Sequence, residues 1–197
     1  MEWSALVVGY LLGSISFSFI VVKKVAGIDI RDHGSGNAGA TNTLRVVGKR
    51  TALIVFALDV LKAMAAVGVG LWLSHDWTIA FASGFAAIIG HNWPIFFQFR
   101  GGKGVAATIG VTALVTFVPA LITGVIAILS IVFTRYVSLG SLIFTVLLPF
   151  AVWLYGEPTS FIWISAGIAV LTVLRHWTNI GRLLKGTESR LGQSSKS

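Results

Sequence analysis

Long runs of uncharged, mostly apolar residues limit what this chain can fold into. Five runs approach or exceed the length at which a helix crosses a bilayer core, about 20 residues for about 30 Å. They cover residues 3–22, 51–73, 78–97, 137–155 and 159–174. Only 11% of the 197 residues are charged, and the mean hydropathy is +0.86, which leaves no room for a separate soluble domain. We therefore expect an all-α, polytopic membrane bundle of one domain, residues 1–197, whose last residues, 190–197, form a disordered tail.

The stretch 106–134 decides how many spans there are. It holds 29 uncharged residues, which as one helix would be about 43 Å long and would need strong tilt to cross. Pro119 lies near its middle, where it would break a helix or turn a hairpin. If 106–134 is a hairpin, every Lys and Arg outside the spans lies on the same side as Lys23 and Lys24, as the positive-inside rule favours. We expect seven spans, with the N-terminus outside and the C-terminus in the cytoplasm; a re-entrant pair is the alternative.

Composition and charge also exclude several classes of protein. The first apolar run has no basic segment before it and its basic flank after it, so we expect a span and not a cleavable signal. The absence of cysteine excludes disulfides, thiolate metal sites and a cysteine nucleophile. The net charge of +8 lies at the cytoplasmic membrane surface in this topology. We therefore expect a membrane-lipid environment and no nucleic-acid partner.

A glycine-rich polar segment, Gly-Ser-Gly-Asn-Ala-Gly-Ala-Thr-Asn at residues 34–42, follows the first span. Glycines let backbone N–H groups approach a ligand closely, and a short helix is expected directly after Gly39. Asn37, Thr41 and Arg45 are spaced four apart and would share a face if this helix begins early. Arg45 would then reach back toward an anion held by the loop amides. The alternative is a flexible loop whose basic residues meet lipid headgroups.

Two further polar segments lie on the same predicted face of the membrane. Residues 101–104 read Gly-Gly-Lys-Gly, in which Lys103 suits a phosphate as a point charge or serves only as a basic anchor. In the C-terminal segment, His176 and Asn179 share a helix face, and Glu188 follows. His176 is either a proton acceptor or a polar cap, and Glu188 either holds substrate or forms a structural salt bridge. Two anion-binding loops at one surface indicate an enzyme that joins two phosphate-bearing substrates, one of them a lipid.

A charged pair lies inside the second predicted span. Asp59 and Lys62 would be roughly 12 to 17 Å from its cytoplasmic end, where unpaired charges cost several kcal/mol. Their i, i+3 spacing permits mutual neutralisation. We expect a structural pair that faces the bundle interior and supports the site, with direct substrate contact as the alternative.

The three polar segments together resemble the bacterial acyl-phosphate glycerol-3-phosphate acyltransferases, the PlsY family. The matching stretches are Asp29-Ile30-Arg31 through Gly34-Ser35-Gly36-Asn37-Ala38-Gly39-Ala40-Thr41-Asn42-Thr43-Leu44-Arg45, Gly90-His91-Asn92-Trp93-Pro94 through Gly101-Gly102-Lys103-Gly104-Val105, and His176-Trp177-Thr178-Asn179-Ile180 through Gly186-Thr187-Glu188. Their order and spacing fit, and the resemblance covers nearly the whole chain. It implies transfer of a fatty acyl group from acyl phosphate to the 1-hydroxyl of glycerol 3-phosphate in the bacterial cytoplasmic (inner) membrane.

The resemblance also implies roles for individual residues. The motif with Ser35 and Arg45 is essential for catalysis and its loop suits the acyl-phosphate headgroup, the 101–104 motif is tied to glycerol 3-phosphate binding, and Glu188 serves integrity or substrate contact. The residues expected to act in catalysis are Ser35, Arg45, His176 and Asn179. The residues expected to bind substrate are Gly34, Gly36, Asn37, Gly39, Thr41, Asn42, Gly101, Gly102, Lys103, Gly104 and Glu188. No metal or other cofactor is expected.

The identity of the proton acceptor stays open at this stage. An acyl phosphate is already an activated mixed anhydride, so no covalent enzyme intermediate is required. The sequence lacks the His-x4-Asp pair of many other acyltransferases. We hypothesise that a phosphate oxygen of the substrate accepts the proton, with His176 as second choice. Transport of a phosphorylated anion is the main alternative to catalysis, and the acyl-chain preference and oligomeric state are not specified by the sequence.

Overall fold

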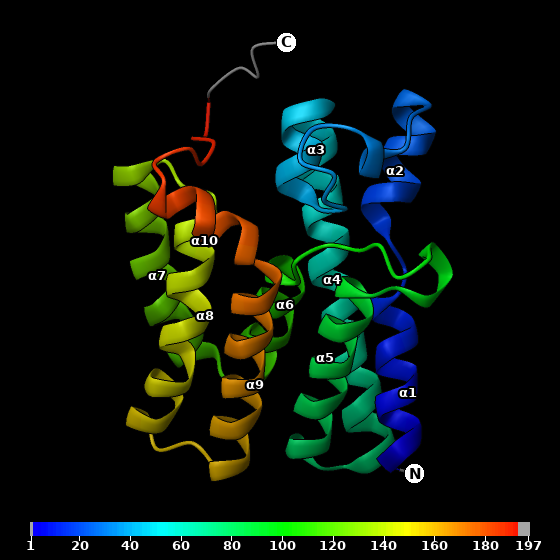
Figure 1. Cartoon of the computed structure of the whole chain (residues 1–197). Coiled ribbons are helices and arrows are strands. Elements are labelled where there is room, and N and C mark those ends of the chain that lie inside the picture. Colours follow the sequence, from blue (N-terminus) through cyan, green and yellow to red (C-terminus); the bar gives the residue numbers. More distant parts are fainter. Residues whose placement is uncertain (1, 193–197) are drawn as a thin grey trace. The chain divides into compact units, whose positions relative to one another are not determined.

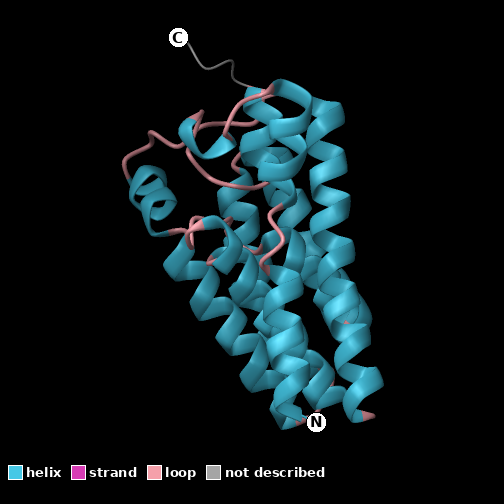
Figure 2. Ribbon diagram, turned by 90° about the vertical axis from the view of Figure 1, so that its right-hand side faces the viewer, coloured by secondary structure: helices cyan, strands magenta, loops and turns pink. Residues whose placement is uncertain are grey.

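The structure, a computed structural model, describes residues 2–192 and the side chains of residues 3–192. Every regular element in that part of the chain is a helix, which confirms the predicted all-α fold (Figures 1 and 2). Residues 1–115 and 116–197 form two compact units, called unit 1 and unit 2. Unit 1 contains α1 (Glu2–Gly13), α2 (Phe17–Ala26), η1 (Ile30–Asp32), α3 (Ala40–Val46), α4 (Lys49–Ser74), α5 (Trp77–Asn92), η2 (Ile95–Phe97) and α6 (Val105–Val115). Unit 2 contains α7 (Phe117–Thr134), α8 (Val137–Leu154), α9 (Thr159–Arg175) and α10 (Trp177–Leu184).

Five helical segments of the described chain are long and apolar enough to cross a membrane, and a sixth is reached if the bent pair α9–α10 counts as one span. The stretch 106–134 does form two helices, but α6 has 11 residues and is only about 16 Å long. The break lies at Thr116, so Pro119 falls in the first turn of α7, where its missing N–H costs no helical hydrogen bond. The count of seven spans and the orientation stay predictions.

Close contacts between backbones hold unit 1 together. A Cβ at Gly13 of α1 would collide with the backbone of Ala87 in α5, and a Cβ at Gly90 would collide with the Tyr10 carbonyl. Small residues at such crossings let membrane helices approach closely. Ser83 Oγ of α5 lies 2.9 Å from both the Ala5 and Ala66 carbonyl oxygens. A single hydroxyl therefore joins α5 to both α1 and α4.

The first span is broken between α1 and α2, and a charged side chain compensates for the break. Unwound backbone inside a membrane needs hydrogen-bond partners from neighbouring protein. Lys62 Nζ of α4 donates to the Ile15 carbonyl at 2.7 Å and pairs with Asp59 Oδ1 at 2.8 Å. Asp59 and Lys62 are 1% and 5% exposed, so the predicted buried ion pair is confirmed.

Unit 2 is a group of three long helices followed by a short one. Gly140 lets α8 approach α7, because a Cβ there would collide with Ile131 and lie 2.9 Å from the Ala127 carbonyl oxygen. α9 and α10 meet at His176 with a bend of 63°. Leu191 N donates to the Arg135 carbonyl at 2.7 Å, so part of the predicted 190–197 tail is held in place. Residues 193–197 of that tail lie outside the described residues.

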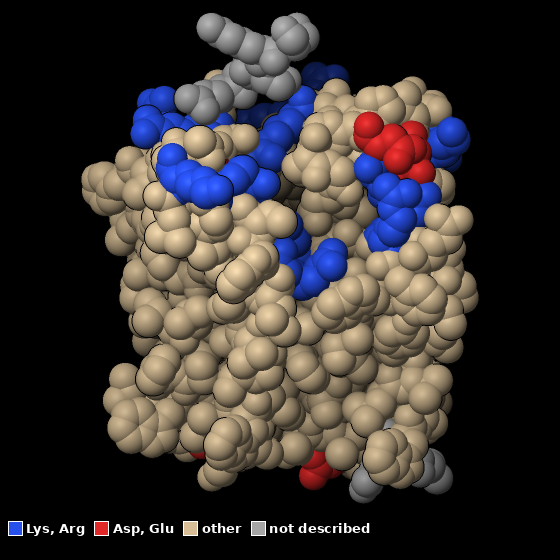
Figure 3. Space-filling view, in the orientation of Figure 1, with Lys and Arg blue, Asp and Glu red and all other residues tan. Residues whose placement is uncertain are grey.

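Apart from the Asp59–Lys62 pair inside α4, the charged residues lie at or near helix ends within each unit. In unit 1 the basic residues follow α2, flank α3 and precede α6, whereas the loop between α4 and α5 carries Asp76. In unit 2 they lie between α7 and α8 and after α9, whereas the loop between α8 and α9 carries Glu157. Figure 3 shows Lys and Arg gathered in patches on an otherwise mostly uncharged face. This distribution fits helices that cross a membrane.

Candidate active site

The first glycine-rich segment is shaped by one buried amide side chain. Asn42 Oδ1 accepts from Ser35 N at 2.9 Å, and Asn42 Nδ2 donates to the carbonyls of Ile30 at 3.1 Å and His33 at 2.9 Å. Gly34 has φ +61° and its Cβ position is occupied by Asn42 Oδ1, so a larger residue does not fit. Asn42 thus holds the loop, and its predicted contact with substrate stays a prediction.

The predicted short helix after Gly39 is present as α3. Because it begins at Ala40, Asn37 lies outside it, and only Thr41 and Arg45 stand one turn apart on a common face. Arg45 and Ser35 are exposed, as a group that meets an incoming ligand must be. Unit 1 therefore presents the two residues whose motif the resemblance marks as essential.

The second glycine-rich segment packs directly against the first. Gly102 N donates to the His91 carbonyl at 3.0 Å. A Cβ at Gly102 would lie 2.7 Å from the Ala38 carbonyl oxygen and would collide with His91 Nε2. The backbones of residues 34–42 and 101–104 therefore meet at Ala38 and Gly102, and only glycine allows this approach. The two predicted anion loops are brought together within unit 1.

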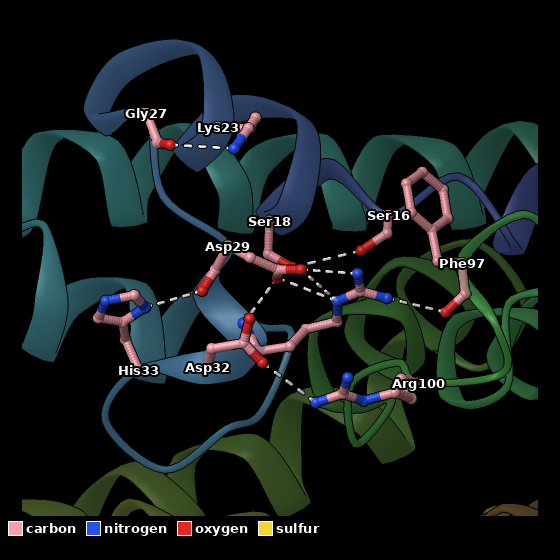
Figure 4. Close-up of polar contacts among 10 residues, drawn as sticks. Ser16, Ser18, Lys23, Gly27, Asp29, Asp32, His33, Phe97 and Arg100 are labelled. Atoms are coloured by element: carbon pink, nitrogen blue, oxygen red, sulfur yellow. Dashed lines mark hydrogen bonds and ion pairs between the residues drawn. The ribbon is translucent and has the colours of Figure 1, made fainter.

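Arg31, to which the sequence analysis assigned no role, links the segment before the first loop to the segment before the second. Its partners Asp29 and Phe97 are labelled in Figure 4. Arg31 pairs with both oxygens of Asp29, the shortest contact being 2.7 Å from Nη2 to Oδ2, and its Nη1 donates to the Phe97 carbonyl at 3.0 Å. Its guanidinium lies 4.8 Å from the Phe19 ring centroid. It secures a strained turn, because Gln98 and Phe99 both have positive φ, 59° and 58°. The signal available in the sequence was an aspartate cap two residues before an arginine.

The Asp29–Arg31 pair is also coupled electrostatically. Hydrogen bonds from the Arg31 guanidinium hold the pKa of Asp29 below its usual value against the opposing effect of burial. The Asp29 carboxylate in turn raises the pKa of Arg31. A second contact, between Arg100 Nη2 and Asp32 Oδ1 at 3.5 Å, is largely exposed, with side chains 55% and 61% accessible. The link between Asp29 and the Phe97 carbonyl, called the Arg31 clamp, is therefore made by Arg31 and not by Arg100.

Glu188 organises the C-terminal site residues in unit 2. Its Oε1 accepts from Asn179 Nδ2 at 2.6 Å and from Ser138 Oγ at 2.8 Å, and its Oε2 pairs with Arg182 Nε at 2.7 Å. Burial raises the pKa of this carboxyl, but the hydrogen bonds from Arg182, Asn179 and Ser138 outweigh it and lower the pKa below its usual value. Sequence reasoning missed Ser138, which lies 50 positions away. The ion pair between Glu188 and Arg182 is the structural salt bridge that the sequence analysis gave as the alternative to substrate contact by Glu188.

His176 occupies the corner between α9 and α10. It is 3% exposed, and its Nδ1 lies 2.9 Å from the Thr172 carbonyl oxygen. A carbonyl only accepts, so Nδ1 carries a proton, and Nε2 is the nitrogen that can gain or lose the second one. The ring thus caps the end of α9, and a part for His176 in proton transfer stays a prediction. Among the described side chains, no cluster of three or more His, Cys, Asp or Glu residues is arranged to hold a metal ion.

The chain is similar over nearly its whole length to proteins that share one name. A family described as glycerol-3-phosphate acyltransferase matches residues 3–186. Proteins named glycerol-3-phosphate acyltransferase from Shouchella clausii and Halalkalibacterium halodurans are 54% and 53% identical, and the matches cover 94% and 100% of this chain and 93% and 98% of theirs. Crystal structures of PlsY, an integral membrane glycerol 3-phosphate acyltransferase, in its glycerol 3-phosphate and lysophosphatidic acid forms, superpose with TM-scores of 0.90 and 0.87. They share 36% and 35% identity over 97% of this chain and 96% and 95% of theirs. The chain belongs to the glycerol-3-phosphate acyltransferase family.

Proposed function

We propose that this protein is a membrane acyltransferase that moves a fatty acyl group from acyl phosphate to the 1-hydroxyl of glycerol 3-phosphate. The products are lysophosphatidic acid and inorganic phosphate. The observation that carries the proposal is the junction at Ala38 and Gly102, where two glycine-rich loops adjoin within one unit. Arg45 follows the first loop in the sequence and Lys103 belongs to the second. Two phosphate anions repel each other, so an enzyme that joins them needs cations and backbone donors at a single place.

The reaction needs alignment and charge stabilisation more than a reactive side chain. The hydroxyl oxygen attacks the acyl carbonyl carbon, the bond from that carbon to the phosphate oxygen breaks, and phosphate leaves. Alignment of two bound reactants supplies roughly 7 to 11 kcal/mol in ideal cases, and a well-placed oxyanion donor roughly 3 to 4 kcal/mol. We assign binding of the phosphate groups to the loop amides, Ser35, Arg45 and Lys103, and the acyl chain to the bilayer between helices.

The proton of the attacking hydroxyl needs an acceptor. We propose that a phosphate oxygen of the substrate takes it, which balances the reaction without a protein base. His176 is the alternative, because its Nδ1 donates to Thr172 and its Nε2 is the basic nitrogen. If turnover falls in His176→Ala and is not restored in His176→Gln while substrate binding holds, the histidine is the acceptor. Unchanged turnover in both variants would exclude it.

Glu188 has a structural role in this proposal, and Asn179 depends on it for its position. Glu188 accepts hydrogen bonds from Asn179, Ser138 and Arg182, so its carboxylate is already engaged by the protein. We propose that it holds the C-terminal segment in position and that it does not bind substrate itself. Asn179 is then placed by Glu188 for its part in the reaction.

The test uses purified protein in lipid vesicles supplied with acyl phosphate and glycerol 3-phosphate, with phosphate and lysophosphatidic acid measured together. A parallel sample receives acyl-CoA as the donor. We expect product from acyl phosphate only and a loss of roughly 100- to 1,000-fold in Arg45→Ala, the scale of a lost transition-state donor. Arg50→Ala, which removes an exposed arginine at the start of α4, is the matched control and should retain activity. No product from folded protein, together with uptake of glycerol 3-phosphate into vesicles, would favour transport.

A further inference from the structure

His91 lies between the buried ion pair of α4 and the second glycine-rich loop. It is in the last turn of α5 and only 7% exposed. Its Nδ1 is 3.1 Å from Lys62 Nζ and 3.5 Å from Asp59 Oδ1. On the opposite edge of the ring, Nε2 occupies the place where a Cβ at Gly102 would be. One imidazole therefore touches the charged pair with one nitrogen and the loop with the other.

The contacts of Lys62 determine which nitrogen of His91 carries the proton. An ammonium group has three donors and no acceptor. Around Lys62 Nζ, the Ile15 carbonyl accepts a hydrogen bond at 2.7 Å, Asp59 Oδ1 is the ion-pair partner at 2.8 Å, and His91 Nδ1 lies at 3.1 Å. A proton on Nδ1 would lie against this ammonium at 3.1 Å, whereas the Asp59 carboxylate oxygen is farther away at 3.5 Å, so the closer contact favours Nδ1 as the acceptor. The neutral ring then carries its proton on Nε2, the nitrogen that faces Gly102.

We propose that His91 is a positioning residue for residues 101–104, with the Asp59–Lys62 pair holding its Nε2–H toward the loop. The backbone reinforces this arrangement, because the His91 carbonyl accepts from Gly102 N at 3.0 Å. His91 thus holds the loop through its main chain and its side chain. The consequence for glycerol 3-phosphate rests on the proposed function, in which this loop binds substrate, whereas the consequence for loop order does not.

The tautomer itself is directly measurable. The chain has 4 histidines, so the spectrum of protein labelled with 15N-histidine is simple, and His91→Gln identifies the His91 signals by their loss. We expect a protonated Nε2 and an unprotonated Nδ1 for His91. A proton on Nδ1 would overturn the proposal.

Three substitutions of His91 distinguish the contribution of Nδ1 from that of Nε2. A glutamine amide reaches the place of Nε2, an asparagine amide reaches only the place of Nδ1, and phenylalanine fills the volume without either nitrogen. If Nε2–H positions the loop, His91→Gln should resemble the wild type, whereas His91→Asn and His91→Phe should not. If His91 serves only to partner Lys62, His91→Asn should be the mild variant instead.

Backbone hydrogen exchange of the substrate-free protein in detergent micelles measures loop order without any assumption about function. We expect exchange at residues 101–104 to be about 3- to 10-fold faster in His91→Asn and His91→Phe, the scale of one lost polar contact, and close to the wild type in His91→Gln. In the acyltransferase assay, the same variants should raise KM for glycerol 3-phosphate about 3- to 10-fold with kcat within about twofold. Equal exchange in Gln and Asn variants would overturn the proposal even if the enzyme is active. A wild type that makes no product would refute the proposed function, and the exchange data would still decide the role of His91.

Discussion

The Arg31 clamp leads to a prediction about stability, in which the neighbouring Arg100 is the control. Arg31→Ala removes the pairing with Asp29 at 2.7 Å and the hydrogen bond to the Phe97 carbonyl at 3.0 Å. It also removes the contact with the Phe19 ring at 4.8 Å. The side chains of Arg31 and Asp29 are 10% and 22% exposed, so water compensates poorly for the loss. Hydrogen bonds to charged groups contribute about 1.5–3 kcal/mol and a cation–π contact about 0.5–2 kcal/mol, depending on its exposure.

From these terms we expect Arg31→Ala to lower the free energy of unfolding by about 2–4 kcal/mol, or the Tm by roughly 5–15 °C for a chain of this size. Arg31→Lys keeps the charge but loses the planar fork, and should fall between Arg31→Ala and the wild type. The assay is thermal unfolding in detergent micelles, combined with hydrogen exchange over residues 95–100. Arg100→Ala is the control, because its contact with Asp32 is long and mostly exposed and should contribute below about 1 kcal/mol. Equal destabilisation by the Arg31 and Arg100 variants would refute the idea that one residue secures the loop.

Two further predictions concern Glu188 and Gly102. The lowered pKa of Glu188 stabilises the fold at pH above the ordinary glutamate value, and this contribution is lost as pH falls through and below it. The stability difference between wild type and Glu188→Gln should therefore shrink between about pH 6 and about pH 3 in denaturation measurements; a constant difference would contradict it. Gly102→Ala should lower kcat/KM, because its Cβ meets Ala38 and His91, whereas Gly68→Ala in α4, which meets no atom within 4 Å, should leave kcat/KM unchanged and stabilise the protein by about 0.5–1 kcal/mol. Equal effects on kcat/KM would contradict the close packing at the loop junction.

Much of the fold could be predicted from the sequence, because the length of an apolar run and the positions of the charges beside it determine where a membrane helix forms. The 106–134 stretch was predicted to be two helices and is two helices, and the Asp59–Lys62 pair follows from its spacing of one helical turn. The exact break in 106–134 was misplaced, since Pro119 fits in the first turn of a helix as readily as it ends one. Local rules cannot choose between these two uses of proline.

Contacts within the site were harder to predict because they join distant positions. The sequence identified both glycine-rich loops, and their junction depends on the contacts of Gly102 with Ala38 and with His91 near the end of α5. Asn42 was expected to bind substrate, but a single-sequence pattern does not reveal that its amide already bonds three backbone groups. The partners of Glu188 include Ser138 on another helix, and nothing in the spacing of the C-terminal motif indicates that contact. Residue type predicts chemistry, whereas tertiary packing decides whether a group is used by the protein or left for a ligand.

The break between α1 and α2 also has a consequence for biogenesis. While α4 is still absent, the Ile15 carbonyl has no Lys62 to bond, and an unsatisfied backbone group in hydrocarbon costs several kcal/mol. The first span to be synthesised therefore lacks the hydrogen-bond partner of its Ile15 carbonyl until α4 has been made. α4 enters the bilayer with Lys62 already balanced by Asp59, which reduces its own cost of insertion. The hydrogen bond that completes the first span therefore forms only after α4 has been synthesised and has packed against it.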